Sequence, residues 1–190
     1  MLDKSIPYKH IIMRRPAGTP IPPAILPAGY RFVFYQPGDE RHWAAIETSV
    51  LEFPAEIDAF IYYQQEWLPY ARELPRRCLF IEDAEGEKVA TGTAFWYYSG
   101  TRRDPWVDWI SVRPECQGIG LGKAIFARVV RLMVEIEGDR DFYLHTQTWS
   151  HKAVRIYEKA GFSMTPEQGL GICPNEYEEA LAILESLGSV

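Results

Sequence analysis

The stretch that decides the fold is WISVRPECQGIGLGKAIF, residues 109–126. It begins as a β-rich strand, continues as a loop with glycine at every second position from 118 to 122, and ends as an apolar helix. A strand, a glycine loop and a helix in this order aim backbone N–H groups and a helix N-terminus at an anion. Glycine is favoured because a Cβ would hold a phosphate away from the main chain and would disfavour a positive φ. The stretch therefore predicts a phosphate-binding loop.

Two well-known phosphate loops do not fit this stretch. Residues 122–123 match the GK of the Walker loop, GxxxxGK[ST]. However, Gln117 replaces the first glycine of that motif, and Ala124 replaces its Ser or Thr. The dinucleotide fingerprint, GxGxxG, fits Gly118 and Gly120 but places a lysine at its third glycine. Too little chain follows for a dinucleotide-binding sheet. Both readings are rejected.

A third pattern, [Q/R]xxGx[G/A], fits residues 117–122 and resembles the acetyl-CoA loop of the GNAT N-acetyltransferase superfamily. Further along, WSHKAVRIYEKAGF at 149–162 resembles the second signature of that family, NxxAxxxYxxxGF. The two signatures occur in the family's order and spacing, and the matching region covers roughly residues 105–163. The resemblance implies a mixed, mostly antiparallel central sheet flanked by helices, within an α/β (α+β) fold.

The order of expected elements agrees with that fold. Strands are predicted over 30–36, 78–83, 88–98, 105–112, 141–147 and the short FSM at 162–164. Helices are predicted after an N-cap at Asp39 and over 55–72, 121–136, 150–161 and 174–187. Neighbouring strands joined by tight turns, followed by βαβ-type units, predict a mixed sheet.

We expect one acetyltransferase domain over 1–190, with two additions at its ends. Residues 1–29 are predicted to form a proline-rich arm, because five prolines and two glycines crowd its second half. Residues 170–190 are predicted to be a C-terminal helical extension. Its helix either packs on the domain or forms a homodimer contact.

Composition excludes several classes of protein. The net charge is −6 without a Lys/Arg-dense run, which argues against a nucleic-acid partner. No apolar run reaches the roughly 18 residues that a membrane span requires. Three cysteines far apart do not form a disulfide framework, and we expect a reducing cytoplasm. The histidines are scattered, so we expect no metal site.

The resemblance also implies how the cofactor is held. In the family, N–H groups of the loop bind the pantetheine pyrophosphate of acetyl-CoA, and backbone donors of the central strand meet the pantetheine and the carbonyl. Lys123 either adds a charge near the phosphates or faces water. Ser150 stands where the family has Asn; it can cap its helix, but its shorter side chain leaves the cofactor contact open. The cofactor-binding candidates are Ile110, Ser111, Val112, Gln117, Gly118, Ile119, Gly120, Leu121, Gly122, Lys123, Ser150 and Tyr157.

Acetyl transfer to an amine requires a deprotonated nucleophile, a stabilised oxyanion and a protonated leaving thiolate. Tyr157 matches the family tyrosine that acts as general acid, although it also fits the apolar face of its helix. Asp108 is the candidate base, and strand alternation puts Trp106, Asp108 and Ile110 on one face. Burial raises the pKa of a carboxyl group, which suits a base near neutral pH. Alternatively Asp108 binds substrate or accepts backbone N–H bonds, Glu52 serves as base, or ordered water does.

The acceptor is an unidentified small-molecule or peptide amine. The predicted helices and strands hold many aromatic residues, most of them expected in the core. Those that are not would form a pocket that favours a cationic or aromatic amine, as would the acidic residues. The alternative function is a non-catalytic module that senses acyl-CoA. The aromatic residues are Trp43, Phe53, Tyr62, Tyr63, Trp67, Trp96, Tyr97, Tyr98, Trp106 and Trp109, and the acidic ones Glu52, Glu56, Asp58 and Asp108.

Overall fold

A computed structural model describes residues 2–171 and 173–188. The strands are β1 (His10–Arg15), β2 (Arg31–Phe34), β3 (Cys78–Glu82), β4 (Lys88–Ser99), β5 (Arg102–Val112), β6 (Phe142–Gln147) and β7 (Ser163–Met164). The helices are α1 (Glu40–Ser49), α2 (Glu56–Glu66), α3 (Leu74–Arg77), α4 (Leu121–Glu137), α5 (His151–Lys159) and α6 (Tyr177–Ser186).

The strands form one mixed sheet in the order β2-β3-β4-β5-β6-β1-β7. The pairs β2–β3, β3–β4, β1–β6 and β1–β7 are antiparallel, whereas β5 and β6 are parallel, with Trp106 opposite Tyr143 and Val107 opposite Leu144. A parallel pair needs a long crossover, and α4 lies in the connection between these two strands. The predicted mixed, mostly antiparallel sheet with helices is confirmed.

Residue contacts divide the chain into two compact units, which are described in turn. The first consists of Pro23–Thr93 and Trp109–Val129; the second consists of Leu2–Pro22, Ala94–Asp108 and the chain from Val130 onward. β4, β5 and α4 each contribute to both units. The single domain over 1–190 stays a prediction.

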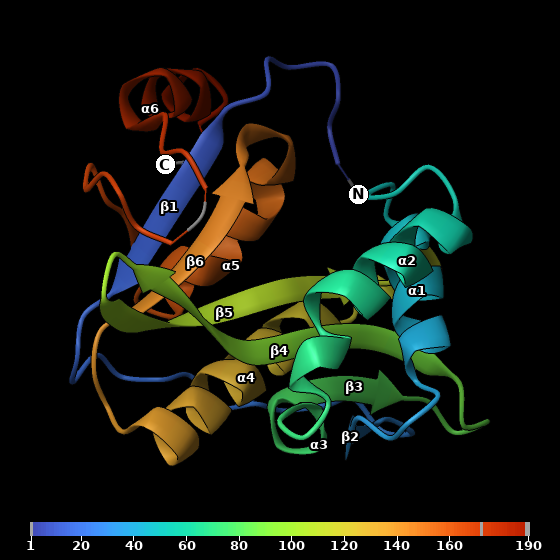
Figure 1. The fold of residues 1–190 in the computed structure, drawn as a ribbon. Coiled ribbons are helices and arrows are strands. Elements are labelled where there is room, and N and C mark those ends of the chain that lie inside the picture. Colours follow the sequence, from blue (N-terminus) through green and yellow to red (C-terminus); the bar gives the residue numbers. More distant parts are fainter. Residues whose placement is uncertain (1, 172, 189–190) are drawn as a thin grey trace. The chain divides into compact units, whose positions relative to one another are not determined.

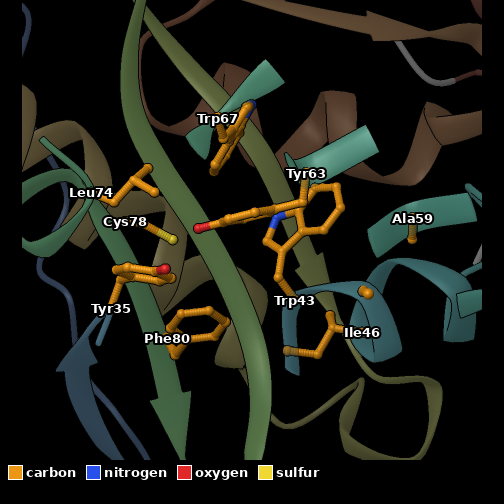
Figure 2. Close-up of a cluster of buried hydrophobic side chains, with 10 residues drawn as sticks. Tyr35, Trp43, Ile46, Ala59, Tyr63, Trp67, Leu74, Cys78 and Phe80 are labelled. Carbon is orange, nitrogen blue, oxygen red and sulfur yellow. The ribbon is translucent and has the colours of Figure 1, made fainter. Parts of the chain in front are cut away.

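The first unit has an aromatic core between α1, α2 and β3 (Figure 2). Trp43 of α1 contacts Tyr63 of α2, with ring centroids 5.1 Å apart. The ring of Tyr63 also contacts that of Trp67, with centroids 5.2 Å apart. These three side chains are at most 1% exposed, so the prediction that they belong to the core is confirmed. Figure 2 shows the hydroxyl of Tyr63 directed toward Cys78. Burial raises the pKa of the Cys78 thiol to about 12, so this thiol stays protonated.

Helix α2 is shorter than predicted. It ends at Glu66, and Leu68–Tyr70 forms a short 3-10 turn before α3. The reason is Pro69, whose ring clashes with the carbonyl four residues earlier and which has no N–H to donate. We predicted a helix over about 55–72 whose end Pro69 disturbs; the disturbance is confirmed, and the extent beyond residue 66 was wrong.

The N-terminal arm of the second unit contains a strand that we did not predict. In β1, Ile11, Ile12 and Met13 are fully buried, and the strand pairs with β6 on one side and β7 on the other. Figure 1 shows β1 beside β6. The prediction of a proline-rich arm over 1–29 was wrong for residues 10–15, which form a buried strand. Pro7 precedes the strand, but the other prolines of the arm begin only at Pro16, after it, and the partners of β1 lie more than a hundred residues away in sequence.

The C-terminal helix packs on its own unit. Ala180 and Leu184 of α6 are fully buried, and the helix contacts β1. Just before α6, Glu176 accepts a bond from the N–H of His10 at 2.9 Å and pairs with the ammonium of Lys9 at 2.8 Å. The packing role predicted for this helix is confirmed, and a homodimer contact stays a prediction.

Two histidines of neighbouring strands meet in the second unit. Nδ1 of His10 lies 2.9 Å from Nε2 of His145, on β1 and β6. Burial, and then the charge of His10, lower the pKa of His145 from 6.5 to about 4. The folded protein therefore keeps His145 neutral at a pH where the unfolded chain would protonate it.

This difference predicts a pH dependence of stability. As the pH falls from about 6.5 toward 4, the unfolded chain binds a proton that folded His145 does not, so the free energy of unfolding decreases. Above that window the contribution is fully present. His145→Gln should flatten the slope in urea unfolding measured between pH 4.5 and 7.5. A slope unchanged by His145→Gln would contradict the prediction.

Candidate functional site

The glycine loop follows β5 in the first unit and has the backbone geometry expected of an anion loop. Gly118 and Gly120 have φ of +85° and +100°, a region that side-chain-bearing residues rarely adopt. A Cβ added to either glycine would meet nothing within 4 Å. Packing inside the protein therefore does not explain why positions 118 and 120 are glycine. The positive φ explains it, and the space beside both glycines is open.

The loop leads directly into α4, a helix of 17 residues. The N–H of Ala124 bonds to the carbonyl of Gly120 at 3.1 Å, so the preceding amides, 121–123, lie at the helix start without an i−4 partner within the helix. Such amides and the helix dipole favour an anion. Lys123 is exposed beside them. The loop thus fits a diphosphate.

Gln117 has a structural role that its pattern alone does not reveal. Its Nε2 donates to the carbonyl of Val112 at 2.8 Å, which ties the loop back to the last residue of β5. This bond sets where the loop departs from the strand. The candidate strand residues and the loop are therefore coupled through one side chain.

Trp109 interrupts β5 with a left-handed backbone, at φ of +49°. Its ring contacts Trp43 at 5.1 Å, Tyr62 at 5.3 Å and Phe53 at 5.6 Å between centroids. Because a left-handed residue breaks strand alternation, neighbours on its two sides need not share a face. Phe53, Tyr62 and Trp109 are half-buried, so they form the outer part of the aromatic cluster.

The alternation predicted for β5 was wrong beyond Trp109. In the second unit, Arg103 reaches Glu137 of α4 at 2.7 Å, so the odd-numbered residues of this part face α4. Trp106 and Asp108 instead meet Tyr97, which confirms the shared face of that pair. In the first unit the even-numbered Ile110 faces α4.

Ile110 explains why β4 carries a glycine at position 92. A Cβ on Gly92 would lie 2.5 Å from Cδ1 of Ile110 and 3.0 Å from Cγ2 of Val129, a residue of α4. Ile110 therefore fills the space that a side chain at position 92 would take. Its side chain is used for packing, and any cofactor contact would come from its backbone.

Sequence analysis missed Glu47, a fully buried carboxylate on α1. Ser111 of β5, itself 9% exposed, donates its hydroxyl to Oε2 of Glu47 at 2.8 Å. The bond joins α1 to the strand segment that holds the cofactor-binding candidates. One signal was available: Glu47 lies four residues after Trp43, on the face of the helix that the apolar residues mark.

The catalytic candidates Asp108 and Tyr157 belong to the second unit, together with Ser150. The hydroxyl of Tyr97 donates to Oδ2 of Asp108 at 2.6 Å, and both side chains are half-buried. Tyr157 is 8% exposed on α5. Ser150 occupies the N-cap position, but its hydroxyl makes no capping hydrogen bond, which corrects the prediction of a side-chain cap.

Comparison with known proteins identifies the family. The model of the acetyltransferase (GNAT) family matches residues 39–162, about two thirds of the chain. The chain belongs to the GNAT acetyltransferase family. This family generally uses acetyl-CoA as cosubstrate. The membership confirms the resemblance drawn from the two sequence signatures and supports acyltransferase activity.

Several proteins are similar to this chain at low identity. Mycothiol acetyltransferase of Streptomyces bingchenggensis (strain BCW-1) is 29% identical over 165 residues, which are 80% of this chain and 50% of that protein. A GCN5-related N-acetyltransferase from Sphaerobacter thermophilus has a TM-score of 0.66 and 22% identity, over 83% of this chain and 49% of its own. A tandem GNAT protein from the clavulanic acid biosynthesis pathway has a TM-score of 0.57 and 18% identity. The match covers 86% of this chain and 52% of that protein's chain. This chain spans about half the length of these relatives.

Membrane-spanning helices, metal-binding clusters and disulfides are absent from the described part of the chain. No helix among residues 2–171 and 173–188 has the length and apolar character that crossing a membrane requires. In the same residues, no three side chains of His, Cys, Asp or Glu are grouped in a way that would hold a metal ion. Cys78, Cys116 and Cys173 are not joined in disulfides.

The loop geometry predicts the effect of a Cβ at Gly120. Gly120→Ala should weaken the binding of coenzyme A about tenfold or more, because the added methyl group would stand in the open space against the loop amides. Isothermal titration calorimetry measures the affinity. Gly38→Ala is the matched control, because Gly38 has a similar φ, +105°, and equally open surroundings. Equal losses of affinity in the two variants would contradict the assignment of the loop.

The buried carboxylate predicts a second effect, on stability. Ser111→Ala removes a hydrogen bond from buried Glu47 and should lower the free energy of unfolding by about 1–3 kcal/mol. Urea unfolding at pH 7 measures the change. Ser163→Ala, at an exposed position of β7, should leave stability within about 0.5 kcal/mol. An unchanged free energy of unfolding in Ser111→Ala would show that the bond is dispensable.

Proposed function

We propose that this protein is an N-acetyltransferase that moves an acetyl group from acetyl-CoA directly to a primary amine. The observation that carries the proposal is the loop at 117–122. Two positive-φ glycines lead into the N-terminus of α4, and nothing within 4 Å occupies the positions of their missing Cβ atoms. Membership of the GNAT family supports the same conclusion.

The residues present fit the cofactor. The amides of Gly118–Lys123 would bind its pyrophosphate, because they belong to the loop and to the first turn of α4. The backbone of Ile110–Val112 would supply further donors, and the Ser111–Glu47 bond would hold this segment against α1. When bound, acetyl-CoA supplies an activated acetyl thioester.

The chain's own residues would then handle the protons. Asp108 would take a proton from the acceptor ammonium, which leaves the nitrogen lone pair available for attack. Backbone N–H groups of 110–112 would donate to the carbonyl oxygen of the acetyl group. The phenol of Tyr157 would give its proton to the departing sulfur. The family resemblance supports the roles of Tyr157 and the backbone; the bond from Tyr97 supports that of Asp108.

The first unit favours a cationic acceptor. Residues 44–71, which include α2, contain five carboxylates and no Lys, Arg or His. The half-buried rings of Phe53, Tyr62 and Trp109 form an aromatic group in the same unit. Carboxylates attract an ammonium group, and aromatic faces bind both cations and apolar bodies. We therefore propose an acceptor amine that carries an apolar or aromatic body.

The test is turnover over a panel of amines. Release of the coenzyme A thiol is measured with acetyl-CoA and a panel of aromatic amines, polyamines, amino acids, peptides and a mycothiol-type acceptor; the last follows the name of the curated relative. Turnover with an amine supports the proposal. Binding of acetyl-CoA without turnover on any amine would instead favour a non-catalytic acyl-CoA sensor.

Tyr157→Phe should lower kcat about tenfold or more while acetyl-CoA still binds, because the variant keeps the ring and loses the proton donor. Steady-state kinetics and calorimetry measure the two effects. Tyr177→Phe, on α6 of the same unit, is the control and should keep the parent kcat. An unaltered kcat in Tyr157→Phe would remove this residue from the mechanism.

A further inference from the structure

We propose that Tyr97 is a positioning residue, which holds the carboxylate of Asp108 in the orientation that receives the proton of the acceptor amine. The inference rests on the proposed function and adds a residue that the family signatures do not contain. It is carried by one contact within the second unit: the hydroxyl of Tyr97, on β4, donates to Oδ2 of Asp108, on β5, at 2.6 Å.

The ring of Tyr97 is fixed by its neighbours. It meets Trp106 edge to face at 5.7 Å and Phe95 edge to face at 5.5 Å between centroids. Trp106 is itself 2% exposed and packs with Ile12, Tyr143 and Leu170. Because the ring cannot turn without disturbing these contacts, the hydroxyl is directed at the carboxylate before any ligand binds.

The loop that follows β7 packs against Trp106, the neighbour of Tyr97. The N–H of Gly171 donates to Oγ of Ser99 at 2.9 Å, and that hydroxyl donates to Asp104. A Cβ on Gly171 would lie 2.7 Å from the ring of Trp106, so only glycine lets the loop approach this closely. The loop therefore restricts the motion of Trp106, and through it the motion of Tyr97.

One further titratable group of this loop is near the pair. Burial, and then the negative charge of Asp108, raise the pKa of Cys173 to about 11. The thiol consequently stays protonated throughout the neutral range and adds no second negative charge beside Asp108. Tyr97 and Cys173 are thus two titratable groups of this unit that interact with Asp108.

The bond has two chemical effects on Asp108. A hydroxyl that donates to a carboxylate at 2.5–2.7 Å makes a charge-assisted bond, which is stronger than a bond between neutral groups. It stabilises the anionic form, which is the form that accepts a proton. It also limits rotation of the carboxylate, so that a proton from the acceptor would meet an oriented lone pair.

The experiment compares two tyrosines of the same unit. Tyr97→Phe keeps the packed ring and removes only the hydroxyl, whereas Tyr177→Phe removes a hydroxyl on α6. For Tyr97→Phe we expect kcat/KM for the amine to fall about tenfold, the acid limb of the pH profile to move to higher pH, and the affinity for acetyl-CoA to stay unchanged. Tyr177→Phe should match the parent protein in all three.

A double variant tests whether Tyr97 acts through Asp108. Adding Tyr97→Phe to Asp108→Asn should cause no further loss, because the carboxylate that the hydroxyl positions is already gone. Fully additive losses would overturn the proposal. A Tyr97→Phe variant with the kinetics and pH profile of the parent protein would overturn it as well.

A titration keeps this inference separate from the proposed function. The carboxyl carbon of Asp108 can be followed by NMR against pH in the parent protein and in Tyr97→Phe. A midpoint that rises in the variant supports the positioning role even if no amine is acetylated, an outcome that would overturn the proposed function alone. An unchanged midpoint overturns the positioning role, whatever the activity.

Discussion

Strand β5 depends on one constraint, the left-handed backbone of Trp109. A residue with a Cβ in this conformation costs of order 1–3 kcal/mol. Contacts of its ring with Trp43, Phe53 and Tyr62 offset that cost, since each aromatic pair contributes roughly 0.5–1.5 kcal/mol beyond area burial. The strained residue is thus maintained by the aromatic core of the first unit. Its position also decides that Ile110 packs toward α4, beside Gly92.

The glycine loop at 117–122 follows the same strand, and its geometry is set from both ends. Gln117 ties the loop to the carbonyl of Val112. At its other end the loop continues into α4, whose first amides have no i−4 partner within the helix. Between these anchors Gly118 and Gly120 supply the positive φ that turns the backbone. A diphosphate would therefore find donors that are already ordered, which lowers the conformational cost of binding.

Two buried or half-buried carboxylates show how polar groups can define a site inside an apolar framework. Glu47 meets the hydroxyl of Ser111, and Asp108 meets that of Tyr97. In each case a neutral hydroxyl donates to the carboxylate, and a buried polar group without such a partner would be costly. The first pair joins a helix to a strand. The second joins two neighbouring strands, and it is the pair that we connect with proton transfer.

The sequence by itself determined the loop, the main helices and strands, and the family. These features depend on local chemistry: glycines at fixed spacing, apolar residues at helical period, and a second signature around Tyr157. Only the tertiary structure decided that residues 10–15 form an inner strand, that Trp109 reverses the faces of β5, and that Tyr97 meets Asp108. These features depend on partners distant in the chain and on one backbone torsion. Neither the residue pattern nor the two-residue alternation of a strand predicts them.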